Sequence, residues 1–119
     1  MKIAVTTMGQ DLDAQVDPRF GRAQGFIVFD TDTGDWQLIP NSVNLNAAQG
    51  AGIQTAQMIS ESGAKAVLTG HCGPKAYRVL NAAGVKIYAG ASGTVSEAVD
   101  AFKSGKLTAS TGPDVEGHW

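Results

Sequence analysis

The chain has 119 residues, 43% of them apolar and 17% charged, with a formal net charge of −2. This length suits one domain with a single core, and the charge argues against a general nucleic-acid or anionic-membrane binder. The single cysteine, Cys72, excludes an intramolecular disulfide framework and fits a reducing compartment. The first apolar run, at 3–5, is too short for a signal peptide or a membrane span. We therefore expect a cytoplasmic protein without a nucleic-acid or membrane partner.

Short apolar runs predict five strands, and three stretches with helical spacing of apolar residues predict three helices. The strands are expected at 2–6, 25–30, 36–40, 65–69 and 85–89, with a hairpin loop at 31–35. The helices are expected at about 50–62, from Pro74 to Gly84, and from just after Gly93 to Gly105. The segment Thr94-Val95-Ser96-Glu97 has the form of a capping box at the start of the third helix.

This order of elements favours one mixed α/β sheet with helices on both faces. The first three strands can form an antiparallel meander, and the last two follow helices, so they should run parallel to their predecessors through right-handed crossovers. We predict the strand order 3-2-1-4-5, with only strand 2 reversed. Residues 1–105 should form a single domain, and residues 106–119 an extended or mobile C-terminal tail.

The predicted topology brings four loops to one edge of the sheet. Strands 1, 3, 4 and 5 point the same way, so the loops at 7–18, 41–50, 70–74 and 90–93 should lie together. Strands 1 and 4 are neighbours whose chains leave in different directions, which is the switch point where open α/β sheets bind ligands. The amino ends of all three helices face this edge, and their N–H groups and dipoles suit an anion.

The turn Gly70-His71-Cys72-Gly73-Pro74-Lys75 carries the densest chemistry of the chain. Cys72 precedes a helix, where a thiolate is stabilised, although a single cysteine is as often a small buried apolar residue. His71 and Cys72 could offer ligands to a soft metal, or His71 could face solvent or cap a carbonyl. Lys75 in the first helical turn could contact a bound anion or remain solvated.

Other loops at the same edge supply further candidates. Arg19 and Arg22 could reach it, or could pair with Asp13 or Asp17 on the surface. Asn44, with its neighbouring asparagines, could donate amides or form turns, and Gly93 and Thr94 resemble a phosphate-cradling turn only loosely. The sequence has no tetrahedral zinc set, no four cysteines for an iron–sulfur cluster, and no persuasive catalytic machinery.

Three motifs together resemble the dinitrogenase iron–molybdenum cofactor-binding family, which includes NifX-like carriers and the C-terminal part of NifB-like proteins. They are Asp17-Pro18-Arg19-Phe20-Gly21-Arg22-Ala23, Gly70-His71-Cys72-Gly73-Pro74-Lys75-Ala76 and Gly93-Thr94-Val95-Ser96-Glu97-Ala98. The resemblance covers nearly all of residues 1–105.

The resemblance implies a ribonuclease-H-like fold without nuclease activity and the binding of a preassembled, molybdenum-containing sulfide cluster. One branch of the family implies an anionic molybdenum–copper sulfide held without covalent attachment, and the other carriers imply the iron–molybdenum cofactor or a precursor. A sulfide-capped cluster needs no protein ligand, so Cys72 could line the pocket. The expected function is non-enzymatic carriage or storage, with cofactor-donor or acceptor proteins as partners. The alternatives are a regulatory or scaffold module that binds a protein through this edge and, more weakly, a small thiol enzyme using Cys72.

Overall fold

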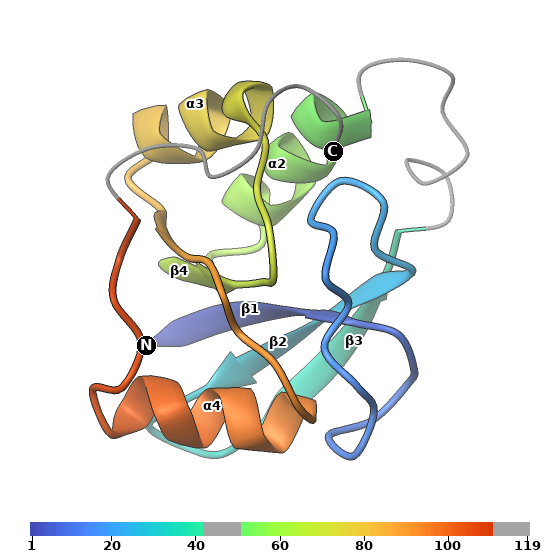
Figure 1. The fold of residues 1–119 in the computed structure, drawn as a ribbon, viewed down its shortest axis with the longest axis vertical. Coiled ribbons are helices and arrows are strands. Elements are labelled where there is room, and N and C mark those ends of the chain that lie inside the picture. The colour runs from blue at the N-terminus through green and yellow to red at the C-terminus, as the bar shows by residue number, and fades with distance from the viewer. Residues whose placement is uncertain (42–50, 111–119) are drawn as a thin grey trace.

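The computed structural model describes residues 1–41 and 51–110. Five strands form one sheet in the order β3-β2-β1-β4-β5 (Figure 1). They are β1 (Lys2–Thr7), β2 (Gly25–Asp30), β3 (Trp36–Pro40), β4 (Ala66–Leu68) and β5 (Lys86–Tyr88). β2 runs antiparallel to β1 and β3, whereas β4 is parallel to β1 and β5 is parallel to β4. The predicted strand order and the single reversed strand are confirmed.

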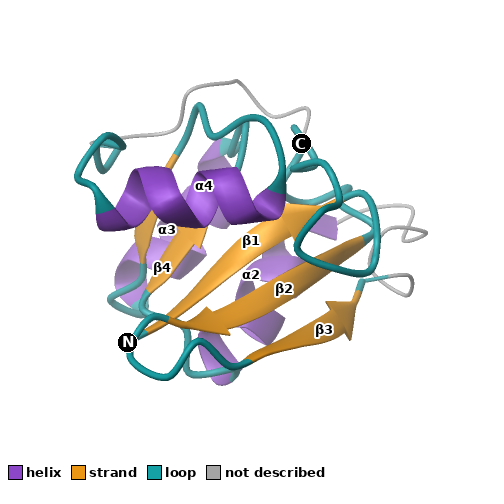
Figure 2. Ribbon diagram, turned by 90° about the horizontal axis from the view of Figure 1, so that it is seen from below, coloured by secondary structure: helices purple, strands orange, loops and turns teal. Residues whose placement is uncertain are grey.

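Three described helices cover the two faces of this sheet. α2 (Ala51–Glu61) and α3 (Pro74–Ala82) pack on one face, and α4 (Val95–Lys103) packs on the other (Figure 2). Alternation along β1 explains the two cores, because successive side chains of a strand point to opposite faces. Ala4 joins the core under α2 and α3, while Ile3 and Val5 join the core under α4. The three-layer α/β fold is therefore as predicted.

The observed elements differ from the predicted ones only at their ends. β4 and β5 are each shorter by one residue at both ends, although flanking backbone bonds still continue the pairing, as from Thr69 N–H to Tyr88 C=O at 3.1 Å. β1 is longer by one residue because Thr7 still pairs with Gly25. Gly63 follows the end of α2 with φ of +88°, the backbone expected of a residue that ends a helix.

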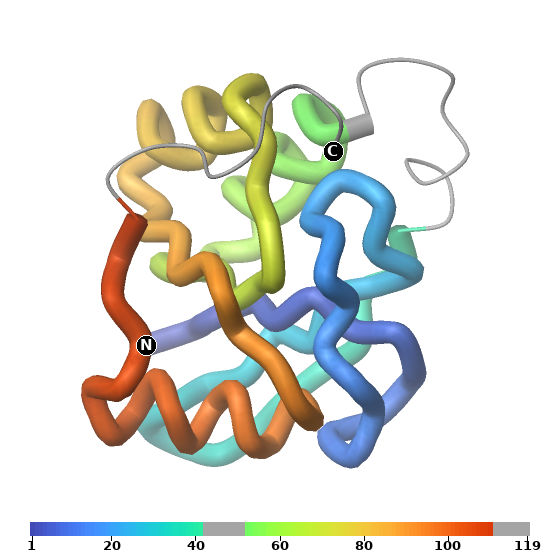
Figure 3. Tube along the Cα trace, in the orientation of Figure 1, coloured from blue at the N-terminus to red at the C-terminus, as the bar shows by residue number. Residues whose placement is uncertain are grey.

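The polar segment 8–18 is held by long-range backbone pairing along its length. Thr7 pairs with Val16, Gln15 with Thr94, and Arg19 with His71. The segment therefore lies between the connection that follows β4 and the start of α4, and Figure 3 shows the 16–22 stretch running beside the β4–α3 connection. A stretch that looks like a solvent-exposed loop in sequence is thus a structural bridge between the two helical layers.

Gly70 makes this bridge possible. A Cβ atom at this position would lie 2.7 Å from both the Cα and the carbonyl oxygen of Pro18, closer than real side chains approach a backbone. The amide of the next residue, His71, donates to that same Pro18 carbonyl at 2.8 Å. The absence of a side chain at Gly70 therefore allows close approach of the Pro18 backbone.

α4 begins with the predicted capping box. The Thr94 hydroxyl accepts a hydrogen bond from the Glu97 amide at 3.1 Å, and the Glu97 carboxylate accepts one from the Thr94 amide at 2.9 Å. These bonds to Thr94 hold the pKa of the Glu97 carboxyl below its ordinary value of 4.5. The amino end of α4 is thus satisfied from within the chain.

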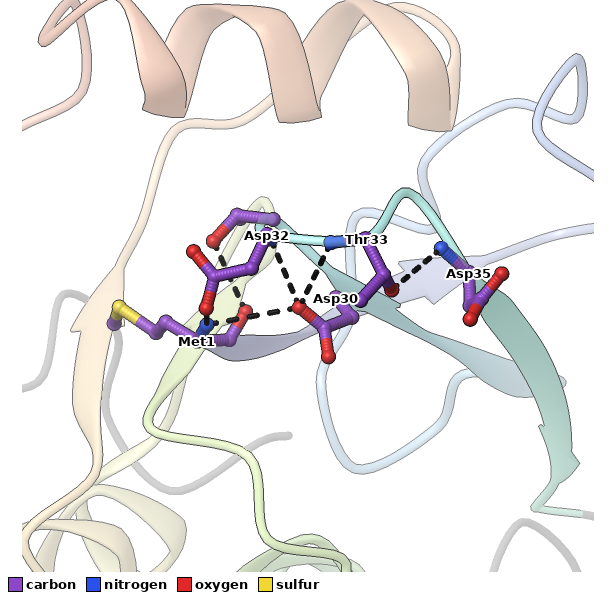
Figure 4. Close-up of polar contacts among 6 residues, drawn as sticks. Met1, Asp30, Asp32, Thr33 and Asp35 are labelled. Atoms are coloured by element: carbon purple, nitrogen blue, oxygen red, sulfur yellow. Dashed lines mark hydrogen bonds and ion pairs between the residues drawn. The ribbon is translucent and has the colours of Figure 1, made fainter.

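At the end of the sheet where β1 begins, the amino terminus is anchored to the β2–β3 hairpin (Figure 4). The Met1 ammonium donates to the Asp32 carboxylate at 2.7 Å and lies 3.7 Å from Asp30 Oδ1. The Asp32 carboxylate raises the pKa of the terminal ammonium, and the Asp32 amide, donating to Asp30, lowers the pKa of that carboxyl. The aspartates of the hairpin thus lie at the opposite end of the strands from the loops that follow β1 and β4.

Residues 106–110 extend away from α4 and lie against β5 and α3. The Ser110 amide donates to the Ile87 carbonyl at 2.7 Å, and the Tyr77 hydroxyl donates to the Ser110 carbonyl at 3.4 Å. Residues 111–119 lie outside the described part, so the division into a domain ending at 105 and a tail stays a prediction. Within the described ranges, no helix has the length and apolar character needed to cross a membrane.

We predict that Gly70→Ala lowers the free energy of unfolding by about 1–3 kcal/mol, because the added methyl group must push the Pro18 backbone away. Urea denaturation followed by circular dichroism measures this loss. Gly34→Asn is the matched control, since Gly34 has open space around it and asparagine tolerates its positive φ of +80°. Equal stability of Gly70→Ala and the wild type would contradict the tight approach.

We predict that Glu97→Gln lowers stability at pH 7 and that this difference disappears on acidification. Glutamine keeps the capping acceptor but removes the charge at the helix start. Because the folded pKa of Glu97 lies below its unfolded value, its charge stabilises the fold above about pH 4.5 and ceases to do so as the pH falls through the folded pKa. Urea denaturation of both proteins from pH 7 to pH 3 tests this, and a difference that persists unchanged at pH 3 would contradict it.

Candidate functional site

The carboxyl ends of β1, β3, β4 and β5 meet at one edge, as the predicted topology requires. β1 and β4 are parallel neighbours, but the chain after β1 returns to β2 on one side and the chain after β4 leads into α3. This is a topological switch point, where diverging connections leave backbone groups of two strands beside each other. The candidate site is therefore built around the ends of β1 and β4.

Two backbone hydrogen bonds hold the Arg19 and His71 segments together at this point. His71 N–H donates to the Pro18 carbonyl at 2.8 Å, and Phe20 N–H donates to the His71 carbonyl at 3.1 Å. Phe20 anchors the turn from below, because its ring is fully buried and packs edge-on against Phe26 with ring centroids 5.3 Å apart. Phe20 therefore fixes the turn to the core.

The anchored turn presents cationic and polar groups outward. The Arg19 side chain is 42% exposed, and His71 and Lys75 are exposed. We call the surface formed by Arg19, His71 and Lys75, over the buried N-cap residue Gly73, the switch-point surface. His71 comes from the turn that joins β4 to α3, Lys75 lies in the first turn of α3, and Arg19 is fixed beside them by the backbone bridge.

The amino end of α3 opens onto this surface without a side-chain cap. Gly73 is the N-cap residue and supplies no side-chain hydrogen bond, and Pro74 takes the first helical position, as predicted. The first turns of helices leave backbone N–H groups that require an acceptor, and the helix dipole favours a negative one. Lys75 places an exposed ammonium group in the same turn, where a bound anion would offset its unfavourable interaction with the dipole. The combination suits an anionic ligand.

The amino end of α4 is different. Thr94 and Glu97 already satisfy its first amides, and Gly93, with φ of +80°, sits where an added Cβ would lie 2.8 Å from the Glu97 carboxylate. α4 also lies on the other face of the sheet from α3. The structure thus brings Arg19, Gly70–Gly73 and Lys75 together, and it places Gly93 and Thr94 across the 14–18 segment with a capping function of their own.

Cys72 points into the protein. Its side chain is 1% exposed, it belongs to the core under α2 and α3, and its sulfur lies 3.7 Å from the Gly73 carbonyl oxygen. Direct metal ligation by this thiol would require the turn to open. Residues 1–41 and 51–110 also contain no group of three or more His, Cys, Asp or Glu side chains placed to hold a metal ion.

The remaining predicted residues fall into two groups. Arg22 is half-buried in the turn that follows Arg19, and Asn44 lies outside the described residues. Asn41, another asparagine of the same loop, lies within the described residues and its side chain is only 1% exposed. Its amide donates to the Ala23 carbonyl at 2.9 Å, and its oxygen accepts a hydrogen bond from the Thr55 hydroxyl at 3.2 Å. Asn41 therefore acts as a structural tie between the 20–24 turn and α2.

Two cavities in the described part of the chain flank the β2–β3 ribbon at its two ends. One of about 270 Å³ lies at the same edge as the switch-point surface and is lined by Met8, Gly9, Gln10, Gln24, Gly25, Leu38 and Pro40. Another of about 250 Å³ lies beside the β2–β3 hairpin, at the other end of the strands, and is lined by residues that include Asp30 and Asp35. Lys2 also lines the second cavity, but two carboxylates against one lysine make it a poor site for an anion.

Asp17 is the residue at this edge that sequence reasoning misjudged. We expected it as a surface partner of Arg19 or Arg22, and Arg19 Nε does lie 3.7 Å from Asp17 Oδ1, but the Asp17 side chain is only 1% exposed. The Asp-Pro pair was the available signal, because an aspartate before proline often accepts a hydrogen bond from the amide two residues on. That bond is present here, from Arg19 N–H to Oδ1 at 3.0 Å.

Comparisons with known proteins agree with this architecture. The apo form of the orange protein from Desulfovibrio gigas superposes with a TM-score of 0.94 at 43% identity, covering 96% of each chain. A candidate NifB protein from Thermotoga, of the DUF35 family, superposes with a TM-score of 0.84 at 36% identity, covering 98% of each chain.

Sequence relatives lead to the same grouping. An uncharacterised protein of Methanocaldococcus jannaschii is 30% identical over 110 residues, which is 90% of this chain and 89% of that protein. The sequence model of the family described as "Dinitrogenase iron-molybdenum cofactor" matches residues 1–105, which include all three motifs singled out from the sequence. The chain therefore belongs to the dinitrogenase iron-molybdenum cofactor family.

Proposed function

We propose that this protein binds a preassembled, anionic metal–sulfide cluster as cargo and carries or stores it without catalysing a reaction. The observation that supports this most is the uncapped amino end of α3 beside Lys75 and Arg19, at the switch point of the sheet. Backbone amides, a helix dipole and two cationic side chains converge there, and each of them stabilises a negative charge.

The cargo is held mainly by non-covalent contacts. A bare metal ion needs three or four protein ligands, and the described residues offer no such set. A cluster whose metals are already bound by sulfide presents only sulfur atoms outward, so it needs hydrogen-bond donors and positive charge instead. The switch-point surface supplies these, and the buried position of Cys72 agrees with non-covalent binding.

A molybdenum–copper sulfide is the cargo that we favour, and the iron–molybdenum cofactor or a precursor is the alternative. The 43% identity to the orange protein of Desulfovibrio gigas and the match to the dinitrogenase iron-molybdenum cofactor family support cargo of this general kind. We further propose that the protein works in the cytoplasm and exchanges its cargo with cofactor-donor or acceptor proteins.

Two other functions lack a comparable observation. A regulatory or scaffold module would use the same edge to bind a protein, and cargo-independent binding of a partner would indicate it. A thiol enzyme would need an accessible Cys72, whereas the structure buries this side chain in the core.

We predict that the apo protein binds one cluster assembled from tetrathiomolybdate and Cu(I), with a visible charge-transfer band. Lys75→Gln should weaken binding about tenfold, equivalent to about 1.4 kcal/mol, because a cation at the open helix end is lost. Absorption titration and molybdenum analysis after gel filtration measure affinity and stoichiometry. Raising the salt concentration should weaken wild-type binding, since exposed charges are screened.

The matched control for this experiment is Lys103→Gln, which removes a lysine from the last turn of α4 on the other face of the sheet. Its affinity should equal that of the wild type. If both lysine variants weaken binding equally, the effect is one of net charge and the switch-point surface is not the site. If no stoichiometric molybdenum stays with the wild-type protein, the proposed function is wrong.

We predict that Cys72→Ala keeps wild-type affinity for the cluster while lowering the free energy of unfolding by about 1–2 kcal/mol, because a buried side chain becomes smaller. The same absorption titration and a urea denaturation measure the two effects separately. Loss of the charge-transfer band in a variant that remains folded would show that the thiol is a ligand.

A further inference from the structure

Asp17 lies directly beneath the switch-point surface and is tied to β1 through its backbone. Its N–H donates to the Thr6 carbonyl at 3.0 Å, and its carbonyl accepts the Thr6 hydroxyl at 2.7 Å. Its side chain is equally fixed, because Oδ1 accepts the Arg19 amide at 3.0 Å. The position of this carboxylate is therefore set by β1 and by the bridge that Arg19 makes to His71.

The second carboxylate oxygen of Asp17 has no partner. Oδ2 is buried and accepts no hydrogen bond, and it is the one such side-chain atom found in the described part of the chain. Buried polar atoms in proteins are normally satisfied, and an exception calls for an explanation in terms of strain, a ligand or a functional charge. A carboxylate beneath a surface that attracts anions also opposes the binding of an anion there, because like charges repel.

Arg19 lies beside this charge, and its contact with Asp17 is a long one. Its Nε lies 3.7 Å from Asp17 Oδ1, beyond hydrogen-bond distance, and the side chain is 42% exposed. The guanidinium thus stands between a buried carboxylate below and the surface above. A guanidinium has five N–H donors in a planar fork, so it can turn donors toward an anion at the surface while it remains near Asp17.

We propose that Asp17 limits the affinity of the switch-point surface for its anionic cargo by competing for the Arg19 guanidinium, so that the cargo can be released. The inference rests on the proposed function and adds to it a residue that sets the strength of binding. Asp17 does not touch the cargo; it acts through Arg19 and is a positioning residue. A lower affinity would speed release, because affinity differences between related complexes lie mostly in the dissociation rate.

The test is a double-mutant cycle on Asp17 and Arg19. Asp17→Asn removes the charge with almost no change in shape, and its remaining oxygen can still accept the Arg19 amide. We expect Asp17→Asn to bind the cluster assembled from tetrathiomolybdate and Cu(I) three- to tenfold more tightly than the wild type. Arg19→Gln should bind it more weakly, and the double variant should bind like Arg19→Gln alone. Asp13→Asn, an exposed acid in the same loop, is the control and should match the wild type.

Two results would overturn the inference. One is equal or weaker binding by Asp17→Asn, and the other is a gain in affinity that persists in the Arg19→Gln background, which would mean that Asp17 does not act through Arg19. A measurement on the wild type covers the case in which Asp17→Asn fails to fold. Nitrogen-15 NMR should show that the cluster shifts both the Arg19 Nε–Hε signal and the Arg19 amide signal, and an unshifted Nε–Hε signal would also overturn the inference.

A separate arm distinguishes failure of the inference from failure of the proposed function. If the wild type binds no cluster, the proposed function fails, and sulfate then serves as the probe for Arg19. Thermal denaturation in increasing sodium sulfate, with sodium chloride of equal ionic strength as reference, should show greater stabilisation of Asp17→Asn than of the wild type. The same stabilisation of both proteins would overturn the inference.

Discussion

The short backbone bridge between Arg19 and His71 is the contact on which the arrangement of this protein's functional edge depends. Two hydrogen bonds join a segment that follows β1 to the turn that follows β4, although the two are some fifty positions apart in the chain. The bridge forms only because Gly70 has no side chain to collide with Pro18. From this contact follow the position of the Arg19 side chain, the burial of Phe20 and the outward placement of the turn that starts α3.

Charges of both signs lie at each end of the strands. The hairpin end carries Asp30, Asp32 and Asp35, and it also carries the Met1 ammonium and the exposed lysines at the starts of β1, β4 and β5, which are Lys2, Lys65 and Lys86. The opposite end carries Arg19, Arg22 and Lys75, and its loops also hold Asp11, Asp13 and the buried Asp17. The number of charges therefore does not distinguish the two ends. What distinguishes the switch-point end is the open amino end of α3 beside Lys75, because a helix dipole and free amides favour an anion there.

Sequence reasoning predicted the elements, their order and the edge at which the candidate residues gather, because periodic apolar residues and glycines or capping residues at helix ends are local signals. It also predicted that the loops at 7–18, 70–74 and 90–93 lie together, but not which of their residues pair. The segment 8–18 has no apolar period, so its pairing with the starts of α3 and α4 could not be inferred, and neither could the burial of Asp17. The glycine and threonine before α4 looked like a ligand-binding turn because capping boxes and anion sites use the same residue types.

The contact between residues 106–110 and β5 has a consequence for how the protein behaves at high concentration. A sheet with open edges can add strands from other molecules and so aggregate. On one edge, the Ser110 amide occupies the Ile87 carbonyl of β5. On the other edge, the backbone N–H of Asn41 donates to the Gln24 carbonyl. Because backbone groups of a strand alternate in direction, the Pro40 position of β3 faces away from β2. Proline has no N–H there to offer a neighbouring strand. The Ser110 contact therefore covers part of the β5 edge and Pro40 removes one donor from the β3 edge, so each edge offers fewer free backbone groups to a second chain.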